Sequence, residues 1–196
     1  RDVYKRQYVG ELGYELLIPA EFALHVFDAV VAAGPAHGLA HGGYFAINSL
    51  RMEKGYRHWG HDIGEEDTPL QAGLGFAVGW DKADFIGRTA LVAERAKGTP
   101  ERRLVQIALE GQDAPLLYHE EPIWRDGAIV GSVTTGGYGH RIGASLGMGY
   151  VTCPSGVSAE WLSAGEWQVE VACIRHKAKV QLAPWYDPAA LRVRQG

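Results

Sequence analysis

A carboxylate that is suited to ligand binding lies near the start of the chain. The segment 8–19 reads YVGELGYELLIP: a turn in which two glycines flank Glu11 leads into a short apolar run that contains Glu15. A carboxylate within an apolar strand is costly unless it is paired or hydrogen-bonded. It can accept two parallel N–H bonds from a flat amidine-like edge, such as that of a guanidinium, pterin or guanine group. From the residues alone, Glu15 either binds such a group or faces solvent on an edge strand.

Histidine and cysteine side chains occur in two pairs with a spacing of three residues, His58 with His61 and Cys173 with His176. On a helix, such a pair can share one metal ion. Neither pair has a second cluster at zinc-finger spacing, and the second pair falls in a predicted strand, so we expect polar roles and no metal site. Two cysteines, Cys153 and Cys173, are too few for a disulfide framework. Free thiols are favoured, and a single bridge between the two stays open.

A glycine-rich run at 136–139 (GGYG) resembles a phosphate-binding loop. The dinucleotide fingerprint, G-x-G-x-x-G after a strand and before a helix, is not met there. We therefore predict a β-turn at these residues rather than a phosphate cradle.

The first half of the chain is predicted to combine strands with helices that would position these residues. Apolar residues recur every four positions from Phe22 to Val30, and Gly34-Pro35 ends this helical pattern. A second helix is expected to end just before Gly55, which stands where a C′ glycine belongs. The predicted elements, in chain order, are a buried strand at 14–18, a helix at 21–33, a helix at 44–54, a strand at 74–80 and a helix at 87–97.

After Pro100 the apolar pattern changes to the two-residue period of β-strands. Asp126-Gly127 between two apolar runs predicts a β-hairpin, because Asp-Gly tolerates the positive φ values of a type I′ turn. Further strands are expected at 133–135, 147–152 and 167–182. Short strands separated by turns are typical of a small barrel or sandwich. We place a domain boundary near residues 97–102.

The composition is that of an ordinary globular protein. Of the 196 residues, 46% are apolar and 21% are charged, and the formal net charge of −4 gives no basic excess for binding nucleic acid. Glycine accounts for 26 of the 196 residues, about twice the average usage of about 7%, and this excess favours β-rich structure. No apolar run approaches the roughly 18 residues of a membrane helix, and no signal peptide is recognisable, so a cytoplasmic protein is expected. The missing initiator Met leads us to expect a fragment.

Several blocks of sequence resemble, in the same order, the folate-binding aminomethyltransferase family. The blocks are YVGELGYELLIP at 8–19, INSLRMEKGYRHWGHDI at 47–63, TPLQAGLGFAV at 68–78, DFIGRTAL at 84–91 and VTTGGYGHRIGASLGMGYV at 133–151. The family includes the T-protein of the glycine cleavage system and the C-terminal half of dimethylglycine and sarcosine dehydrogenases. The form RMEKGYRHWGHDI is closer to the dehydrogenase branch. Ile47 agrees with this, because it stands where T-proteins carry an arginine for folate.

The resemblance implies an α+β fold, with the C-terminal part of a folate-binding aminomethyltransferase domain at 8–98 and a small all-β barrel domain at 99–196. Residues 1–7 do not match the family and are interpreted as a non-native leader. The implied cofactor is tetrahydrofolate, and FAD would belong only to a flavin domain upstream. The implied partners are small molecules, folate and an N-methyl amine substrate, and neither nucleic acid nor a membrane is expected.

The resemblance also implies a reaction. In the dehydrogenase branch a flavin domain oxidises an N-methyl amine, and tetrahydrofolate captures the one-carbon unit as 5,10-methylenetetrahydrofolate. Tyr8 matches the tyrosine that lines the folate site, and Glu15 matches the carboxylate that binds the pterin ring. The family's catalytic aspartate belongs to a region before Tyr8, so we expect no catalytic residue in this segment and a chain that is inactive, or a weak folate binder, by itself. The alternatives are the glycine-cleavage aminomethyltransferase and a non-catalytic folate-binding accessory protein.

Overall fold

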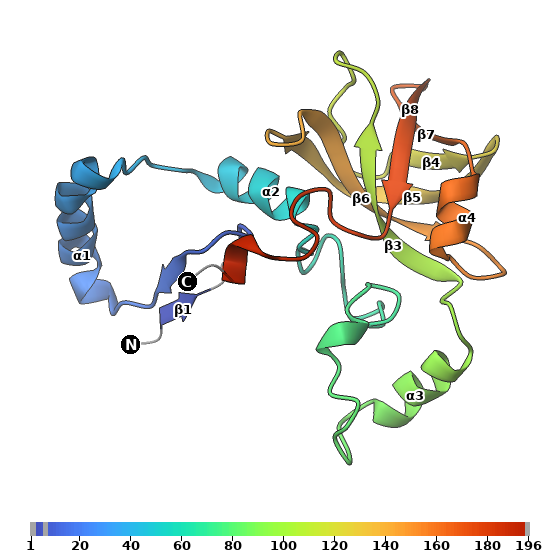
Figure 1. The fold of residues 1–196 in the computed structure, drawn as a ribbon, viewed down its shortest axis with the longest axis horizontal. Coiled ribbons are helices and arrows are strands. Elements are labelled where there is room, and N and C mark those ends of the chain that lie inside the picture. Colours follow the sequence, from blue (N-terminus) through green and yellow to red (C-terminus); the bar gives the residue numbers. More distant parts are fainter. Residues whose placement is uncertain (1–2, 6–7, 195–196) are drawn as a thin grey trace.

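The computed structural model describes residues 3–5 and 8–194, which form a helical N-terminal part and a C-terminal β-barrel (Figure 1). The N-terminal part begins with a two-stranded antiparallel ribbon, in which Tyr4 is paired with Glu15 along the backbone. Of the predicted leader, residues 1–2 and 6–7 lie outside the described residues. The elements of this part are β1 (Val3–Lys5), β2 (Tyr14–Leu16), α1 (Ala20–Ala33), η1 (Gly34–His37), α2 (Tyr44–Glu53), η2 (Gly75–Ala77) and α3 (Arg88–Ala96).

The three predicted helices are confirmed as α1, α2 and α3. α2 ends as expected: Gly55 follows it with a φ of 63°, in the left-handed region that glycine adopts without strain. α1 continues into η1 at Gly34, because Pro35 fits the first turn of a 3-10 helix. α1 stands apart from the barrel (Figure 1), and none of its residues is buried.

Two predicted strands differ from the structure. β2 forms within the predicted range 14–18, but 60% of Tyr14 and 51% of Leu16 are exposed, so the prediction of a buried strand is wrong. Among the described residues, no second layer covers the side chains of β2 in this two-stranded ribbon. The run 74–80 is not a strand, because η2 and the adjoining turns fold it back until Trp80 Nε1 donates to the Gly75 carbonyl at 2.9 Å.

Within the described residues, six antiparallel strands close into a barrel, which was one of the two arrangements that the pattern after Pro100 left open and the one that the family resemblance implies. Their order around the barrel is β3-β6-β5-β4-β7-β8. A short helix, α4 (Ala159–Ala164), is capped by Ser158, whose hydroxyl accepts the Trp161 N–H at 3.1 Å. The strands are β3 (Arg102–Leu109), β4 (Pro122–Arg125), β5 (Ala128–Gly139), β6 (Ala144–Thr152), β7 (Trp167–Val171) and β8 (Ile174–Gln181), and η3 (Arg192–Arg194) follows them.

Three further predictions concern the strands and turns of the barrel. The hairpin at Asp126-Gly127 is confirmed, since these residues join β4 to β5 with φ values of 50° and 84°. The stretch 167–182 is divided into β7 and β8 by a turn that contains Cys173 at a φ of 65°. The run 136–139 lies inside β5, so the prediction of a β-turn there is wrong.

Two apolar clusters form the core. The main cluster joins side chains from several barrel strands, among them Val105, Ile107, Ile123, Val133 and Val169. The second lies between α2 and the barrel, where Met52 packs with Leu146 and Met148 and fixes the end of α2. Cys153, which is buried in the main cluster, and the exposed Cys173 are both free. None of the helices described is long and apolar enough to cross a membrane.

Candidate functional site

The C-terminal end of α2 is buried although it is highly charged. Arg51, Glu53 and Lys54 are each at most 2% exposed, and Met52 among them belongs to the second core cluster. A charged side chain that has lost its water is stable only when hydrogen bonds and opposite charges compensate. Each of the three accordingly contacts a different part of the chain.

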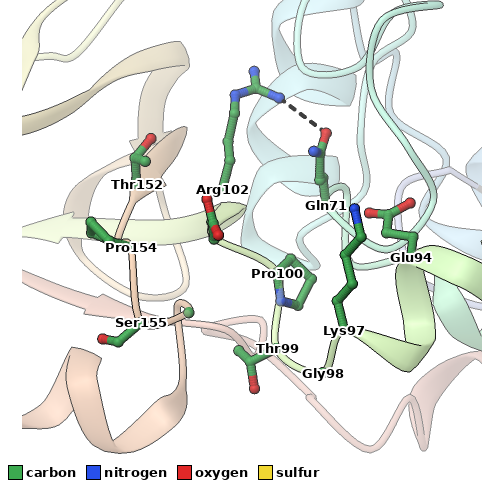
Figure 2. A pocket seen from close by; sticks show the side chains of 12 residues that line it. Gln71, Glu94, Lys97, Gly98, Thr99, Pro100, Arg102, Thr152, Pro154 and Ser155 are labelled. Atoms are coloured by element: carbon green, nitrogen blue, oxygen red, sulfur yellow. Dashed lines mark hydrogen bonds between the residues drawn. The ribbon is translucent and has the colours of Figure 1, made fainter.

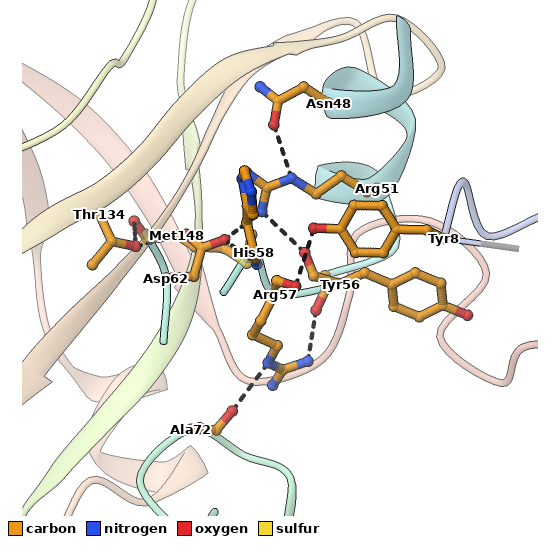
Figure 3. A network of polar contacts seen from close by, with 11 residues as sticks. Tyr8, Asn48, Arg51, Tyr56, Arg57, His58, Asp62, Ala72, Thr134 and Met148 are labelled. Carbon is orange, nitrogen blue, oxygen red and sulfur yellow. Dashed lines mark hydrogen bonds and ion pairs between the residues drawn. The ribbon is translucent and has the colours of Figure 1, made fainter. Parts of the chain in front are cut away.

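Arg51 forms a buried ion pair with Asp62, and the two side chains are 1% and 0% exposed (Figure 3). Arg51 Nε donates to Asn48 Oδ1 at 2.8 Å, and Nη1 also donates to the Tyr56 carbonyl at 3.0 Å. The Asp62 carboxylate accepts, in addition, the backbone N–H of His58 at 2.8 Å. The pair thereby fixes the course of the loop that follows α2.

The same carboxylate reaches the barrel. The Thr134 hydroxyl on β5 lies 2.8 Å from Asp62 Oδ1 and 3.2 Å from the Met148 carbonyl oxygen. A hydroxyl has one hydrogen to donate, and the shorter contact to the charged acceptor takes it. Asp62 therefore connects the loop after α2 to β5 and, through Arg51, to α2 itself.

Glu53 holds the turn between β5 and β6. Its Oε1 accepts the backbone N–H groups of Arg141 at 2.6 Å and Ile142 at 3.4 Å, and its carbonyl accepts the Tyr186 N–H at 3.0 Å. The Tyr186 hydroxyl donates to Glu11 Oε1 at 3.1 Å, and the Arg141 guanidinium pairs with the same carboxylate at 3.0 Å. The predicted turn around Glu11 is thus fastened to the barrel and to the C-terminal segment.

Tyr8 lies beside this network, at a cleft of about 540 Å³. Its hydroxyl donates to the Arg57 carbonyl at 3.0 Å, and its ring stacks on Tyr56 with the centroids 6.2 Å apart (Figure 3). Burial raises the pKa of Tyr8 and Arg51 opposes this, so the phenol stays protonated at neutral pH. The cleft also has apolar walls, which include Leu74, Phe76, Leu182, Pro184 and Pro188. Such a lining suits a planar organic ligand.

Lys54 closes one side of the cleft through Asp187. Lys54 Nζ donates to Asp187 Oδ2 at 2.7 Å and to the Asp187 carbonyl at 3.0 Å. Gly10 packs on the Lys54 stem, where any β-carbon would overlap the lysine side chain. The hydrogen bond from Lys54 lowers the pKa of Asp187 from 3.8 to about 2.

The acid stability of the chain is expected to report this pair. Because its folded-state pKa is lowered, Asp187 contributes stability that is fully present above pH 3.8 and is lost as the pH falls through about 2. In thermal unfolding followed by circular dichroism, the wild-type chain should therefore have a higher midpoint temperature than Asp187→Asn above pH 3.8. The difference between the two midpoints should vanish at about pH 2. Glu110→Gln, at a partly exposed pair with Lys179, is the matched control and should show little difference. A gap that stays constant with pH would contradict the prediction.

Comparison with known proteins identifies the family. Residues 3–82 match the GCVT N-terminal domain, and residues 102–187 match the glycine cleavage T-protein C-terminal barrel domain. The chain belongs to the glycine cleavage T-protein family. The family resemblance and the α+β fold followed by a barrel are therefore confirmed, and the second match spans β3 to β8.

Relatives of this GCVT-family chain include oxidising enzymes. Sarcosine dehydrogenase of Mus musculus is 41% identical, over 95% of this chain and 20% of its own length. 4-Methylaminobutanoate oxidase (formaldehyde-forming) of Paenarthrobacter nicotinovorans is also 41% identical, over 95% of this chain and 22% of its own length. The crystal structure of glycine cleavage system aminomethyltransferase T from Bartonella henselae matches with a TM-score of 0.80 and 26% identity, over 95% of this chain and 50% of that chain. The chain thus spans about a fifth of the two curated relatives.

The GCVT-family structure does not bring the two predicted site residues together. Tyr8 lines the cleft, whereas Glu15 is exposed on β2 and is not part of the cleft lining. A folate-binding role for either residue stays a prediction. The rings of His58 and His61 lie 4.6 Å apart, and the described residues contain no group of three or more His, Cys, Asp or Glu that could hold a metal ion.

The burial of Arg51, Glu53 and Lys54 in this GCVT-family chain was not predicted from the sequence. Cations at a helix C-terminus are favourable even when they are exposed, so the positions of Arg51 and Lys54 at the end of α2 do not by themselves indicate burial. One signal was available: Arg51, Glu53 and Lys54 point in different directions around a helix end that also carries Met52. Charged side chains that surround a buried apolar residue at a helix end indicate that other segments of the chain pack around that end and pair with the charges.

A second hollow, of about 600 Å³, lies where α3 leads into β3 (Figure 2). Its lining includes two acidic and two basic side chains, those of Glu94, Glu101, Lys97 and Arg102. Arg102 Nη1 donates to Gln71 Oε1 at 3.5 Å across it. These charges balance, and the described lining has no aromatic side chain. We therefore place the candidate site of the GCVT-family chain at the Tyr8 cleft.

Proposed function

We propose that this chain is the tetrahydrofolate-binding C-terminal segment of an FAD-linked N-demethylating dehydrogenase of the dimethylglycine or sarcosine type. The 41% identity with mouse sarcosine dehydrogenase over 95% of the chain is the observation that supports this most. The one-carbon unit released from the N-methyl amine is transferred to tetrahydrofolate, giving 5,10-methylenetetrahydrofolate. In this proposal, residues 8–98 belong to the folate-binding domain and residues 99–196 are the barrel domain. A cytoplasmic location also stays a prediction, and the mouse relative is mitochondrial by name.

The residues of the Tyr8 cleft fit tetrahydrofolate chemically. The stacked rings of Tyr8 and Tyr56 offer a surface to a planar ligand, and the apolar walls add further contact area for it. Glu15 lies outside this cleft; in the proposal it would accept the 2-amino and N3–H edge of the pterin as two parallel hydrogen bonds. Bound tetrahydrofolate supplies the nitrogen atoms that accept the one-carbon unit. FAD is assigned to a flavin domain of a longer protein and to no residue described here.

The second candidate function is that of a glycine-cleavage aminomethyltransferase. The TM-score of 0.80 with the Bartonella henselae enzyme supports it. The two candidates differ in their donors, because the dehydrogenase acts on a free N-methyl amine and the aminomethyltransferase on a carrier-bound aminomethyl group. A longer protein that contains this chain and oxidises sarcosine or dimethylglycine in the presence of a dye acceptor would support the first candidate. Turnover only with a lipoyl carrier protein would support the second.

Titration calorimetry with tetrahydrofolate tests the proposed site. We expect the chain alone to bind with a dissociation constant weaker than about 1 μM and to show no turnover, because it spans a fifth of its dehydrogenase relative. Glu15→Ala should weaken binding by about tenfold or more, since it removes a charge-assisted pair of hydrogen bonds. The fold should not change, because Glu15 is exposed.

Glu21→Ala is the matched control for this titration, since Glu21 is an exposed carboxylate on the neighbouring helix α1. It should leave the affinity unchanged. Equal affinities for the wild-type chain and Glu15→Ala would reject the role of Glu15 in the site. Submicromolar binding by the wild-type chain would reject the expectation that the chain alone is a weak binder.

A further inference from the structure

Arg57 carries a charge at the Tyr8 cleft that forms no ion pair with any described residue. Its Nε donates to the Ala72 carbonyl at 3.0 Å, and its Nη1 donates to the Gly55 carbonyl at 2.6 Å (Figure 3). A guanidinium has five N–H donors, and Nη2 has no hydrogen-bond partner within the part of the chain that the structure describes. The side chain is therefore anchored along one edge and free at its end.

The surroundings of Arg57 favour a ligand of negative charge. Burial lowers the pKa of its guanidinium, which shows that the charge has lost part of its hydration. The carboxylates nearby are engaged elsewhere: Asp187 is paired with Lys54, and Asp62 with Arg51. A partly desolvated cation without a carboxylate partner binds an incoming anion more strongly than a fully hydrated one does.

We propose that Arg57 binds the carboxylate end of a ligand whose aromatic ring lies in the Tyr8 cleft. This inference rests on the proposed function and assigns Arg57 to the glutamyl carboxylates of tetrahydrofolate. The two backbone carbonyls already hold the guanidinium in place, so little side-chain freedom is lost on binding. The aromatic walls at Tyr8 and Tyr56 accept the benzoyl ring next to these carboxylates.

Comparison of two ligands isolates this contact. Tetrahydrofolate and its diamide, in which both glutamyl carboxylates are amides, have the same rings and differ in charge. We expect the wild-type chain to bind tetrahydrofolate about tenfold more tightly than the diamide, measured by calorimetry. Arg57→Leu should bind the two ligands with equal affinity, because its loss of affinity relative to the wild-type chain should be confined to tetrahydrofolate. Arg57→Lys keeps the positive charge but loses the planar guanidinium group with its paired N–H donors, and it should retain part of the preference for tetrahydrofolate over the diamide.

The outcomes separate the inference from the proposed function. Equal binding of both ligands by the wild-type chain, or an equal loss for both in Arg57→Leu, overturns the role of Arg57 and leaves folate binding in place. No binding of either ligand by the wild-type chain overturns the proposed function and the inference with it. If Arg57→Leu does not fold, Arg57→Lys must reduce the preference by itself, and an unchanged preference overturns the role.

Sarcosine provides a third arm, because it carries a carboxylate without an aromatic ring. Sarcosine binding that depends on Arg57, together with equal binding of tetrahydrofolate and its diamide, would show that the carboxylate belongs to an amine substrate. That result overturns the assignment to folate. Failure of sarcosine to bind, with the folate preference present, supports it.

Discussion

Replacement of Asp62 by alanine is expected to lower the free energy of unfolding by about 3–5 kcal/mol, the cost of leaving a buried charge without its partner. Arg51 and Asp62 are 1% and 0% exposed, so the change leaves the guanidinium of Arg51 buried without its counter-charge. The change also removes the acceptor of the His58 N–H and of the Thr134 hydroxyl. Urea unfolding would show a lower midpoint with an unchanged slope.

Glu170→Ala is the matched control for this change, because it removes a carboxylate from a partly exposed pair with Arg175 whose atoms are 3.5 Å apart. Exposed pairs contribute about 0–1 kcal/mol. Arg51→Met combined with Asp62→Leu removes both charges and should cost less than Asp62→Ala alone. Similar losses in Asp62→Ala and Glu170→Ala would show that burial does not govern the contribution of the ion pair.

Elements whose signals are local agree with the sequence predictions. The helix that becomes α2 ends at a glycine with positive φ, and the Asp126-Gly127 hairpin depends on two adjacent residues. Neither signal needs information from elsewhere in the chain. The family resemblance draws on motifs spread over the whole chain, and it identifies the fold where periodicity alone leaves a barrel and a sandwich open.

Burial, by contrast, depends on which distant segments meet, and the predictions that required it are the ones that differ. Glu15 lies in a strand as expected, yet nothing in the described chain covers that strand. Arg51 and Lys54 are buried because Asp62 and Asp187 pair with them, and Asp187 is 133 positions away from Lys54. The sequence contains these charges but does not show which of them pair, so of the two predicted site residues, Tyr8 and Glu15, only Tyr8 lies at the cleft.

The glycine run at 136–139 shows the same limit. Glycine is frequent in turns, and that association predicts a turn where the structure has a long strand. The reason for glycine in β5 is close approach: the loop before β4 passes Gly136 at Leu117, and α2 packs over Gly137. Neither neighbour is close in sequence, so only the fold reveals why these positions lack a side chain.

Alanine at Gly136 is accordingly expected to lower the free energy of unfolding by about 3 kcal/mol, near the upper end of the range for overpacking. A β-carbon at Gly136 would overlap the carbonyl group of Leu117, and backbone cannot swing aside as a side chain can. Leu117 is itself fully buried, so displacement of its segment would disturb the main core. Urea unfolding of the variant measures the loss.

Gly137→Ala is the matched control, because successive residues of a strand point to opposite faces. A β-carbon at Gly137 would lie 3.3 Å from Met52 Sδ and 3.7 Å from Asn48 Nδ2, and both are ends of flexible side chains that can move. Its loss should stay within about 1 kcal/mol, partly offset by the lower chain entropy of alanine in the unfolded state. A similar loss in both variants would mean that the strand needs glycine for its backbone. A loss confined to Gly136→Ala would mean that one face of β5 is shaped by the passage of Leu117.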